Sequence, residues 1–350
     1  MRQSIRVLGY AAVSCAALLT ASLPATAAEQ ITINGSSTVY PYARAVAQAI
    51  TAQGKTAMVP SIVSTGTGAG IDQFCSNKAD STDLVNASRR MKAEELETCT
   101  RNGHEVVEIK IGYDAIVLAQ NKQSTPLSLT RKDVYLALAS KVLDQNGTSF
   151  LPSSPYTKWK DVNASLPETP IRVFGPALTR GTRDTFAEMV LLEGCTELPY
   201  FKSMQERKGR NLHTLCQAVR NDVAYSDVPE EEGAILKMMQ SSPDMIGIMN
   251  YRIYQAHTND LQAVRVEGST PEFAHIESGA YPLTRPLYFY VKKERAQANP
   301  DIAAYLAEFT SENTIGANGY LVQQGLVPAN AQERAASAKA AQELPLLQLP

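Results

Sequence analysis

Hydrophobic and polar positions along the chain alternate between a strand-like and a helix-like period. Short apolar or β-branched runs predict strands at 30–34, 58–64, 84–88, 106–119 (broken at Gly112) and 171–174. Amphipathic segments predict helices at 41–53, 70–77, 92–102, 131–140 and 182–193, the last ended by Gly194. Strands that alternate with helices predict an α/β fold with a parallel-type sheet covered by helices on both faces.

The last third of the chain adds two simpler expectations. Tyr281, Tyr288, Phe289 and Tyr290 form an aromatic cluster in a predicted strand, which indicates core packing rather than a ligand platform. The Ala-, Gln- and Lys-rich stretch 329–342 predicts a surface helix, and 343–350 predicts a frayed end.

Three glycine- and hydroxyl-rich turns stand where helices are predicted to start, at 35–38, 65–70 and 179–184. A helix start presents unpaired N–H groups and a partial positive charge, so three of them together can hold one compact oxyanion. Ordinary structural roles also exist, because Ser and Thr cap helices and glycines such as Gly66, Gly68 and Gly70 allow positive φ. We favour a binding site, since ligands of α/β sheets lie at the carboxyl ends of strands.

The N-terminus has the pattern of a secretory signal peptide. Arg2 and Arg6 precede an apolar run over 7–23, and a small-x-small motif ends at Ala27. We expect cleavage after Ala27, with Ala28 as the near alternative. An uncleaved anchor and a lipoprotein anchored at Cys15 are weaker alternatives, the second because 12–14 make a poor lipobox.

Charge and cysteine content agree with an exported protein. Removal of Arg2 and Arg6 leaves 31 basic against 35 acidic residues, a net charge of −4, so an anion site must be built from local donors and no nucleic acid is expected as a partner. Four cysteines remain after removal of the leader, and an even number in an oxidising compartment suggests two disulfides with three possible connectivities. The sequence-local pairing is Cys75 with Cys99 and Cys195 with Cys216.

Catalytic, metal and cofactor motifs find little support. The chain has no Gly-x-Ser-x-Gly elbow and no Cys-x-x-Cys, and its four histidines lack ligand spacing. His104-Glu105 is followed by Glu108 where a zinc-protease motif requires histidine, and Ala49 stands where a P-loop requires glycine. We therefore expect a binding protein without enzyme activity, metal or cofactor.

The chain resembles the periplasmic phosphate-binding proteins of ABC importers, the PstS-like family. The resemblance runs from 31–41 through 174–176 and 181–184 to 281–288. It implies a two-lobed, type II periplasmic binding fold whose cleft closes on the anion. It also implies a first lobe at 28–112, a second at 113–285 and a return at 286–350, after a signal peptide at 1–27.

The resemblance assigns ligand contacts residue by residue. The candidates are Ser37 and Thr38 in the first turn, Thr67 in the second, Ser88 and Arg89 after the third strand, and Arg180, Gly181, Thr182 and Arg183 in the third turn. Two departures from the family stand out. Arg89 occupies the position of a carboxylate that accepts a hydrogen bond from protonated phosphate, and Pro176 replaces an arginine. Arg89, joined by Arg180 or Arg183, is expected to neutralise the anion. For each of these arginines, the alternative to an anion contact is a solvated surface charge or a salt bridge.

Discrimination between phosphate and sulfate remains open at this point. A buried carboxylate accepts a proton from monohydrogen phosphate and repels fully ionised sulfate. Asp72, Asp114 and Asp184 are the candidates.

The resemblance implies capture of inorganic phosphate by a monomer in the periplasm and its delivery to an inner-membrane ABC permease. The alternatives are another oxyanion (sulfate, molybdate or arsenate), or an exported sensing or adhesion protein on the same scaffold.

Overall fold

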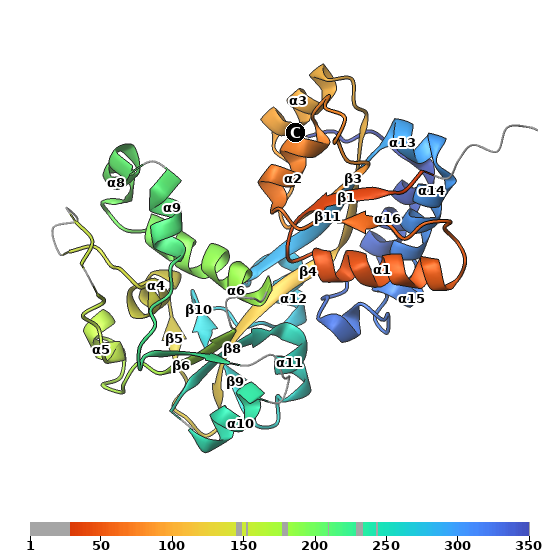
Figure 1. Cartoon of the computed structure of the whole chain (residues 1–350). Coiled ribbons are helices and arrows are strands. Elements are labelled where there is room, and N and C mark those ends of the chain that lie inside the picture. Colours follow the sequence, from red (N-terminus) through yellow and green to blue (C-terminus); the bar gives the residue numbers. More distant parts are fainter. Residues whose placement is uncertain are drawn as a thin grey trace, which may run out of the picture.

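The computed structural model describes residues 29–144, 149–151, 153–176, 181–208, 210–228, 234–242 and 244–349. The expected signal peptide and Arg180 lie outside these ranges. Two bodies of mixed helix and strand are joined by two long strands that run between them (Figure 1). We call the body with both chain ends of the described part lobe I and the other lobe II. Within the described ranges, no helix is both long and apolar enough to cross a membrane.

One curled sheet of nine strands runs through both lobes. Its order is β2-β1-β3-β11-β4-β8-β6-β7, with β9 paired to β4. The strands are β1 (Thr32–Gly35), β2 (Ser61–Ile62), β3 (Leu84–Ala87), β4 (Val106–Asn121), β6 (Val173–Pro176), β7 (Tyr225–Val228), β8 (Ile246–Asn250), β9 (Leu261–Ala263) and β11 (Thr284–Lys292). A separate ribbon pairs β5 (Ser128–Leu129) with β10 (Arg265–Val266).

The sheet is mixed, which corrects the expectation of a parallel-type sheet. Pairing is parallel among β1, β2 and β3 and among β6, β7 and β8. The joining strands β4 and β11 are antiparallel to each other and to β8 and β3, respectively. The chain leaves lobe I along β4 and returns along β11, so these two strands must run in opposite directions.

Helices cover both lobes. Lobe I carries α1 (Tyr40–Ala52), α2 (Thr67–Phe74), α3 (Ala93–Arg101), α13 (Lys293–Ala298), α14 (Pro300–Phe309), α15 (Glu312–Ile315), a 3₁₀ turn (Val322–Gln324) and α16 (Ala331–Glu343). Lobe II carries α4 (Arg131–Leu138), α5 (Trp159–Val162), α6 (Gly181–Phe186), a π-helix (Ala187–Leu192), α7 (Glu193–Thr196), α8 (Phe201–Lys208), α9 (Arg210–Gln217), α10 (Ala234–Ser241), α11 (Tyr251–Ala256) and α12 (Phe273–Ser278).

Gly112 marks an irregularity rather than an end of β4. The register between β4 and β11 shifts between Leu287 and Tyr288, opposite Gly112. Gly112 has φ of +144°, and a Cβ there would lie 2.6 Å from the carbonyl oxygen of Val327. The predicted break is therefore a bulge that only glycine accommodates well, because L side chains rarely adopt this φ.

Apolar side chains fill a core on each side of the sheet in lobe I. Ile33 and Phe289 face α1 and α14, whereas Ile71, Phe74 and Tyr290 form the other layer. The core role expected for the aromatic cluster is confirmed, since Tyr281, Phe289 and Tyr290 are fully buried and Tyr288 is nearly so.

The helix predicted at 182–193 is three consecutive segments, namely α6, the π-helix and α7, and Gly194 lies inside α7. The prediction that Gly194 ends this helix is wrong. A Cβ on Gly194 would lie 2.2 Å from the carbonyl oxygen of Arg131, so the glycine lets α7 approach α4 closely.

Two disulfides and the C-terminal segment complete the framework. Cys75 is bonded to Cys99 and Cys195 to Cys216, the sequence-local connectivity. Helix α16 packs on β4, where the Ser337 hydroxyl donates to the Lys110 carbonyl at 2.6 Å. The expectation of a frayed end fails at Leu347, whose N–H donates to the Val106 carbonyl at 2.8 Å.

Candidate functional site

All three special turns precede helices in the structure. Helix α1 follows the first turn, α2 begins at Thr67 in the second, and α6 begins at Gly181 in the third. The first turn leaves the carboxyl end of β1 at Gly35, and the third follows β6, which ends at Pro176. The expected placement at a strand end and a helix start is confirmed for the first turn, and the second turn lies between β2 and α2. Residues 179 and 180 of the third turn lie outside the described ranges, and Gly181 begins α6.

The backbone ties the first two turns to the end of β3. The Gly35 carbonyl accepts hydrogen bonds from the Thr65 and Gly66 N–H groups at 3.0 and 2.9 Å. The Ser36 N–H donates to the Asn86 carbonyl at 2.9 Å. Gly66 has φ of +88°, which glycine adopts without strain. These contacts hold three segments that are distant in sequence as one unit.

Hydroxyl groups and an arginine gather at the start of α2. The Thr67 hydroxyl oxygen lies 3.1 Å from the Ser88 hydroxyl oxygen and accepts from the Ser88 N–H at 3.1 Å. The N-cap residue of α2 is Gly66, which has no side chain to cap the first N–H groups of the helix, and these groups have no intrahelical partner. A Cβ on Gly68 would lie 3.9 Å from an Arg89 terminal nitrogen, which places the guanidinium beside this helix start.

Arg89 is oriented by a two-point ion pair. Its terminal nitrogens donate to the Glu95 carboxylate at 2.9 and 2.6 Å, and one of them also donates to the Arg90 carbonyl at 3.1 Å. These bonds to Glu95 are the main cause that raises the pKa of the Arg89 guanidinium. They use three of the five N–H donors of an arginine, so donors remain for an anion.

The first turn also meets lobe II. The Thr38 hydroxyl oxygen lies 3.3 Å from that of Thr185 on α6. Ser37 lines a pocket whose other lining residues all belong to lobe II. Thr182 is half-buried in the first turn of α6, next to Gly181. The structure therefore brings the first turn against the helix that begins at the third.

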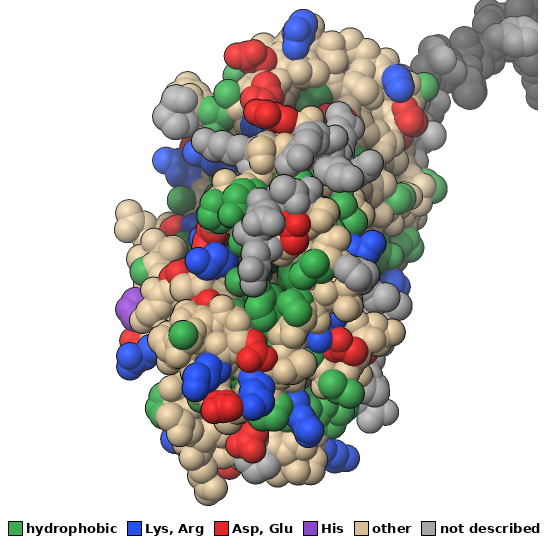
Figure 2. Space-filling model, turned by 90° about the vertical axis from the view of Figure 1, so that its left-hand side faces the viewer, with side chains coloured by type: hydrophobic (Ala, Val, Ile, Leu, Met, Phe, Trp, Pro, Cys, Tyr) green, Lys and Arg blue, Asp and Glu red, His purple; other side chains and the backbone are tan. Residues whose placement is uncertain are grey.

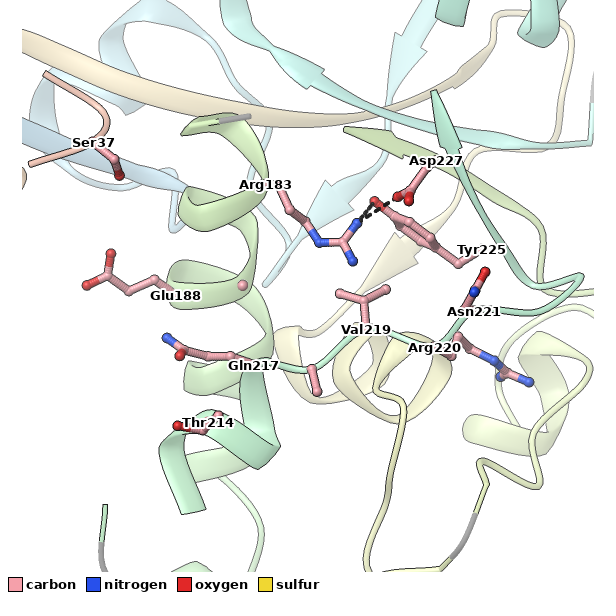
Figure 3. Close-up of a pocket in the computed structure, with 12 residues that line it drawn as sticks. Ser37, Arg183, Glu188, Thr214, Gln217, Val219, Arg220, Asn221, Tyr225 and Asp227 are labelled. Carbon is pink, nitrogen blue, oxygen red and sulfur yellow. Dashed lines mark hydrogen bonds and ion pairs between the residues drawn. The ribbon is translucent and has the colours of Figure 1, made fainter. Parts of the chain in front are cut away.

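Arg183 is engaged within lobe II (Figure 3). One terminal nitrogen donates to the Pro176 carbonyl at 3.0 Å and to the Tyr225 hydroxyl at 2.5 Å, and it lies 3.1 Å from an Asp227 carboxylate oxygen. Burial raises the pKa of Tyr225 to about 12, so its hydroxyl stays protonated at neutral pH. These contacts agree with the alternative role of Arg183, which is to form a salt bridge.

The pocket between these elements has a volume of about 630 Å³. Its lining residues are Ser37, Arg183, Ala187, Glu188, Thr214, Gln217, Ala218, Val219, Arg220, Asn221, Tyr225 and Asp227. Acidic and basic side chains are interspersed on the face of the molecule in Figure 2, so attraction of an anion there relies on local donors. No group of three or more His, Cys, Asp or Glu side chains in the described ranges is arranged to hold a metal.

The structure separates the three carboxylate candidates. Asp72 is exposed on α2, and the side chain of Asp184 lies outside the described part. Asp114 is buried where β4 leaves lobe I; it accepts from the Thr185 hydroxyl at 3.2 Å and lies 3.6 Å from the Arg285 Nε. Burial raises the pKa of Asp114, although Arg285 and Thr185 oppose this shift.

We expect Asp114 to make stability depend on pH. An acid with a raised folded-state pKa contributes fully below its unfolded pKa, near 3.8, and that contribution is lost as pH rises through the folded pKa. The free energy of unfolding of the wild type, relative to Asp114→Asn, should therefore fall as pH rises above this value. Chemical denaturation across pH measures it, with the exposed Asp72→Asn as control. A difference that rises with pH would contradict the assignment.

Three residues of this region escaped the sequence reasoning. These are Thr185, Glu188 and Arg285, and Arg285 donates to both of the others at the junction of the lobes. Arg285 lies within the motif 281–288, but nothing in its neighbourhood along the chain indicates a partner on α6. Its contacts depend on how the two lobes meet.

Comparisons with known proteins agree with this architecture. Residues 20–313 match a family model described as a PBP superfamily domain. The chain is 29% identical to protein SphX of Synechocystis sp. over 320 residues, covering 89% of this chain and 81% of SphX. It is 28% identical to the phosphate-binding protein PstS of Staphylococcus saprophyticus, covering 76% and 71%.

Solved structures show the same fold. A possible phosphate binding protein from Planctomyces limnophilus has a TM-score of 0.72 at 22% identity, covering 90% of this chain and 98% of that chain. An ABC-type phosphate transport receptor from Vibrio cholerae has a TM-score of 0.56 at 17% identity, covering 85% and 99%. The two-lobed fold and the family match over most of the chain together establish that this protein belongs to the PBP superfamily.

Proposed function

We propose that this protein captures inorganic phosphate in the cleft between its lobes and delivers it to an inner-membrane ABC permease. The observation that carries the proposal is the gathering of the Thr67 and Ser88 hydroxyls and the Arg89 guanidinium at the start of α2, whose N-cap residue is a glycine. Hydroxyl and N–H donors beside one positive charge form a site for a compact oxyanion. Relatives named as phosphate-binding proteins support phosphate as that anion.

The proposed contacts come from both lobes. Lobe I supplies Ser37, Thr38, Thr67, Ser88 and Arg89, and lobe II supplies the start of α6 with Arg180, Gly181, Thr182 and Arg183. Because the Arg89 guanidinium stands beside the start of α2, Arg89 is the principal counter-charge in this proposal. The proposed lobe boundaries are 28–112, 113–285 and 286–350, so β4 and β11 carry the hinge.

The mechanism follows from fixed dipoles in a closing cleft. The open cleft admits hydrated phosphate, and lobe closure replaces its water shell with N–H and O–H groups that are already oriented. Asp114 is the carboxylate that we propose for discrimination, since it is buried at the lobe junction. No bond is made or broken, so the proposal assigns no enzyme activity. The protein would act as a monomer in the periplasm after removal of residues 1–27.

Titration calorimetry tests this proposal. The purified chain is freed of bound anion by unfolding and refolding, and is then titrated at pH 7 with phosphate and, separately, with sulfate. One-to-one binding of phosphate without a response to sulfate is the expected result. A folded protein that binds sulfate and not phosphate would assign the cleft to another oxyanion, and one that binds neither would refute anion capture.

A further inference from the structure

Arg285 bridges the two lobes beside the proposed site. One terminal nitrogen donates to the Thr38 hydroxyl of lobe I at 2.9 Å and to the Thr185 hydroxyl of lobe II at 2.9 Å. The other donates to the Glu188 carboxylate at 2.6 Å. The Arg285 side chain is only 11% exposed, so these contacts occur largely out of water. A guanidinium, with its planar fork of donors, is suited to bind three groups at once.

The hydrogen bonds around Arg285 fix the direction of the Thr38 hydroxyl. The Thr185 hydroxyl donates its proton to Asp114 at 3.2 Å, so it acts toward Arg285 as an acceptor. The Thr38 oxygen likewise accepts from Arg285, so its own proton can be donated, and the Thr185 oxygen at 3.3 Å is one acceptor within reach. Arg285 thereby holds Thr38 as a donor, and either the Thr185 hydroxyl or a bound oxyanion can accept its proton.

Arg285 also compensates a negative charge at the pocket. Glu188 lines the pocket and carries a half-exposed carboxylate, which would repel an anion if it were unpaired. In Figure 3 its side chain extends on the opposite side of the helix from the Arg183 guanidinium. The pKa of Arg89 is raised mainly by its hydrogen bonds to Glu95 and to a smaller extent by the negative charge of Glu188.

We propose that Arg285 is a positioning residue for the bound oxyanion. It orients the Thr38 hydroxyl, neutralises Glu188 beside the pocket and joins lobe I to α6, so lobe closure and anion binding depend on each other. This inference rests on the proposed phosphate capture and adds to it a residue from the returning strand β11.

The test compares phosphate binding by the wild type, Arg285→Gln and Arg285→Lys. We expect Arg285→Gln to weaken phosphate binding about tenfold or more, chiefly through faster release measured by stopped flow. Lysine keeps the positive charge but lacks the planar set of N–H donors of a guanidinium, so Arg285→Lys should keep only part of the affinity for phosphate. Arg334→Gln is the matched control, because Arg334 also binds a carboxylate (Glu312) and a backbone carbonyl (Ala329), outside the pocket.

The possible results separate failure of the proposed function from failure of the role of Arg285. A wild type that binds no phosphate refutes the proposed function itself, whereas equal binding by wild type and Arg285→Gln overturns only the role of Arg285. Small-angle scattering adds a readout of closure, and phosphate should compact the wild type more than Arg285→Gln. If Arg285→Gln fails to fold, Thr185→Val and Arg285→Lys replace it. Their effects on affinity should be non-additive in the double variant, and additive effects would overturn the inference.

Discussion

Replacement of Arg89 by alanine is expected to lower the affinity for phosphate by about ten- to a hundredfold. The substitution removes the positive charge at the start of α2, and hydrogen bonds between charged groups contribute about 1.5–3 kcal/mol each. Glu95 would also lose its two-point partner and leave an uncompensated carboxylate near the anion. Titration calorimetry on the anion-free protein measures the change.

Arg90→Ala is the matched control for Arg89→Ala. Arg90 is the next residue, is more exposed and is paired with Glu108. It therefore carries the same positive charge but binds a different carboxylate. Its loss should change phosphate affinity little, because exposed ion pairs contribute about 0–1 kcal/mol. If the two alanine variants bind phosphate equally, Arg89 is not the counter-charge.

Replacement of Gly35 by alanine is expected to destabilise the fold by about 2–4 kcal/mol and to abolish phosphate binding. Gly35 has φ of +123°, and a Cβ there would lie 2.1 Å from the Asn86 carbonyl oxygen. The same carbonyl accepts from Ser36, so the clash would separate the first turn from the end of β3. Denaturant unfolding measures stability, and calorimetry measures binding.

Gly54→Ala separates the two causes of this effect. Gly54 also has positive φ, +66°, but a Cβ there meets no atom within 4 Å. Gly54→Ala should lower the free energy of unfolding by about 1 kcal/mol through backbone strain alone and leave phosphate binding intact. Equal destabilisation by the two substitutions would show that close approach to Asn86 is unimportant.

Local features of the chain predicted much of the fold. Alternating strand and helix patterns, glycine-rich turns before helices and the sequence-local disulfides each depend on residues that are near one another in sequence. The burial of Phe289 and the bonded pair Cys75–Cys99 agree with these predictions, whereas α2 begins at Thr67, three residues before the predicted start. An apolar run identifies a strand but not its direction, which is why the antiparallel course of β4 and β11 was not predicted.

The remaining differences arise from contacts over long sequence distances. Gly194 looked like a helix end, yet its role depends on the Arg131 carbonyl of α4. Arg285 and Thr38 are separated by 247 residues and meet only because β11 returns between the lobes. The local pattern of side chains carries no signal for such contacts. The contacts of Arg285 with both lobes could therefore not be predicted from the sequence.

A crystal structure of the chain with bound phosphate would show where the anion lies relative to α2 and α6. We expect one phosphate ion at the start of α2, within hydrogen-bond distance of the Thr67 and Ser88 hydroxyls and of the Arg89 guanidinium, with the start of α6 closed over it. A phosphate ion bound elsewhere, or a closed cleft in which Arg89 remains engaged only with Glu95, would refute this binding site.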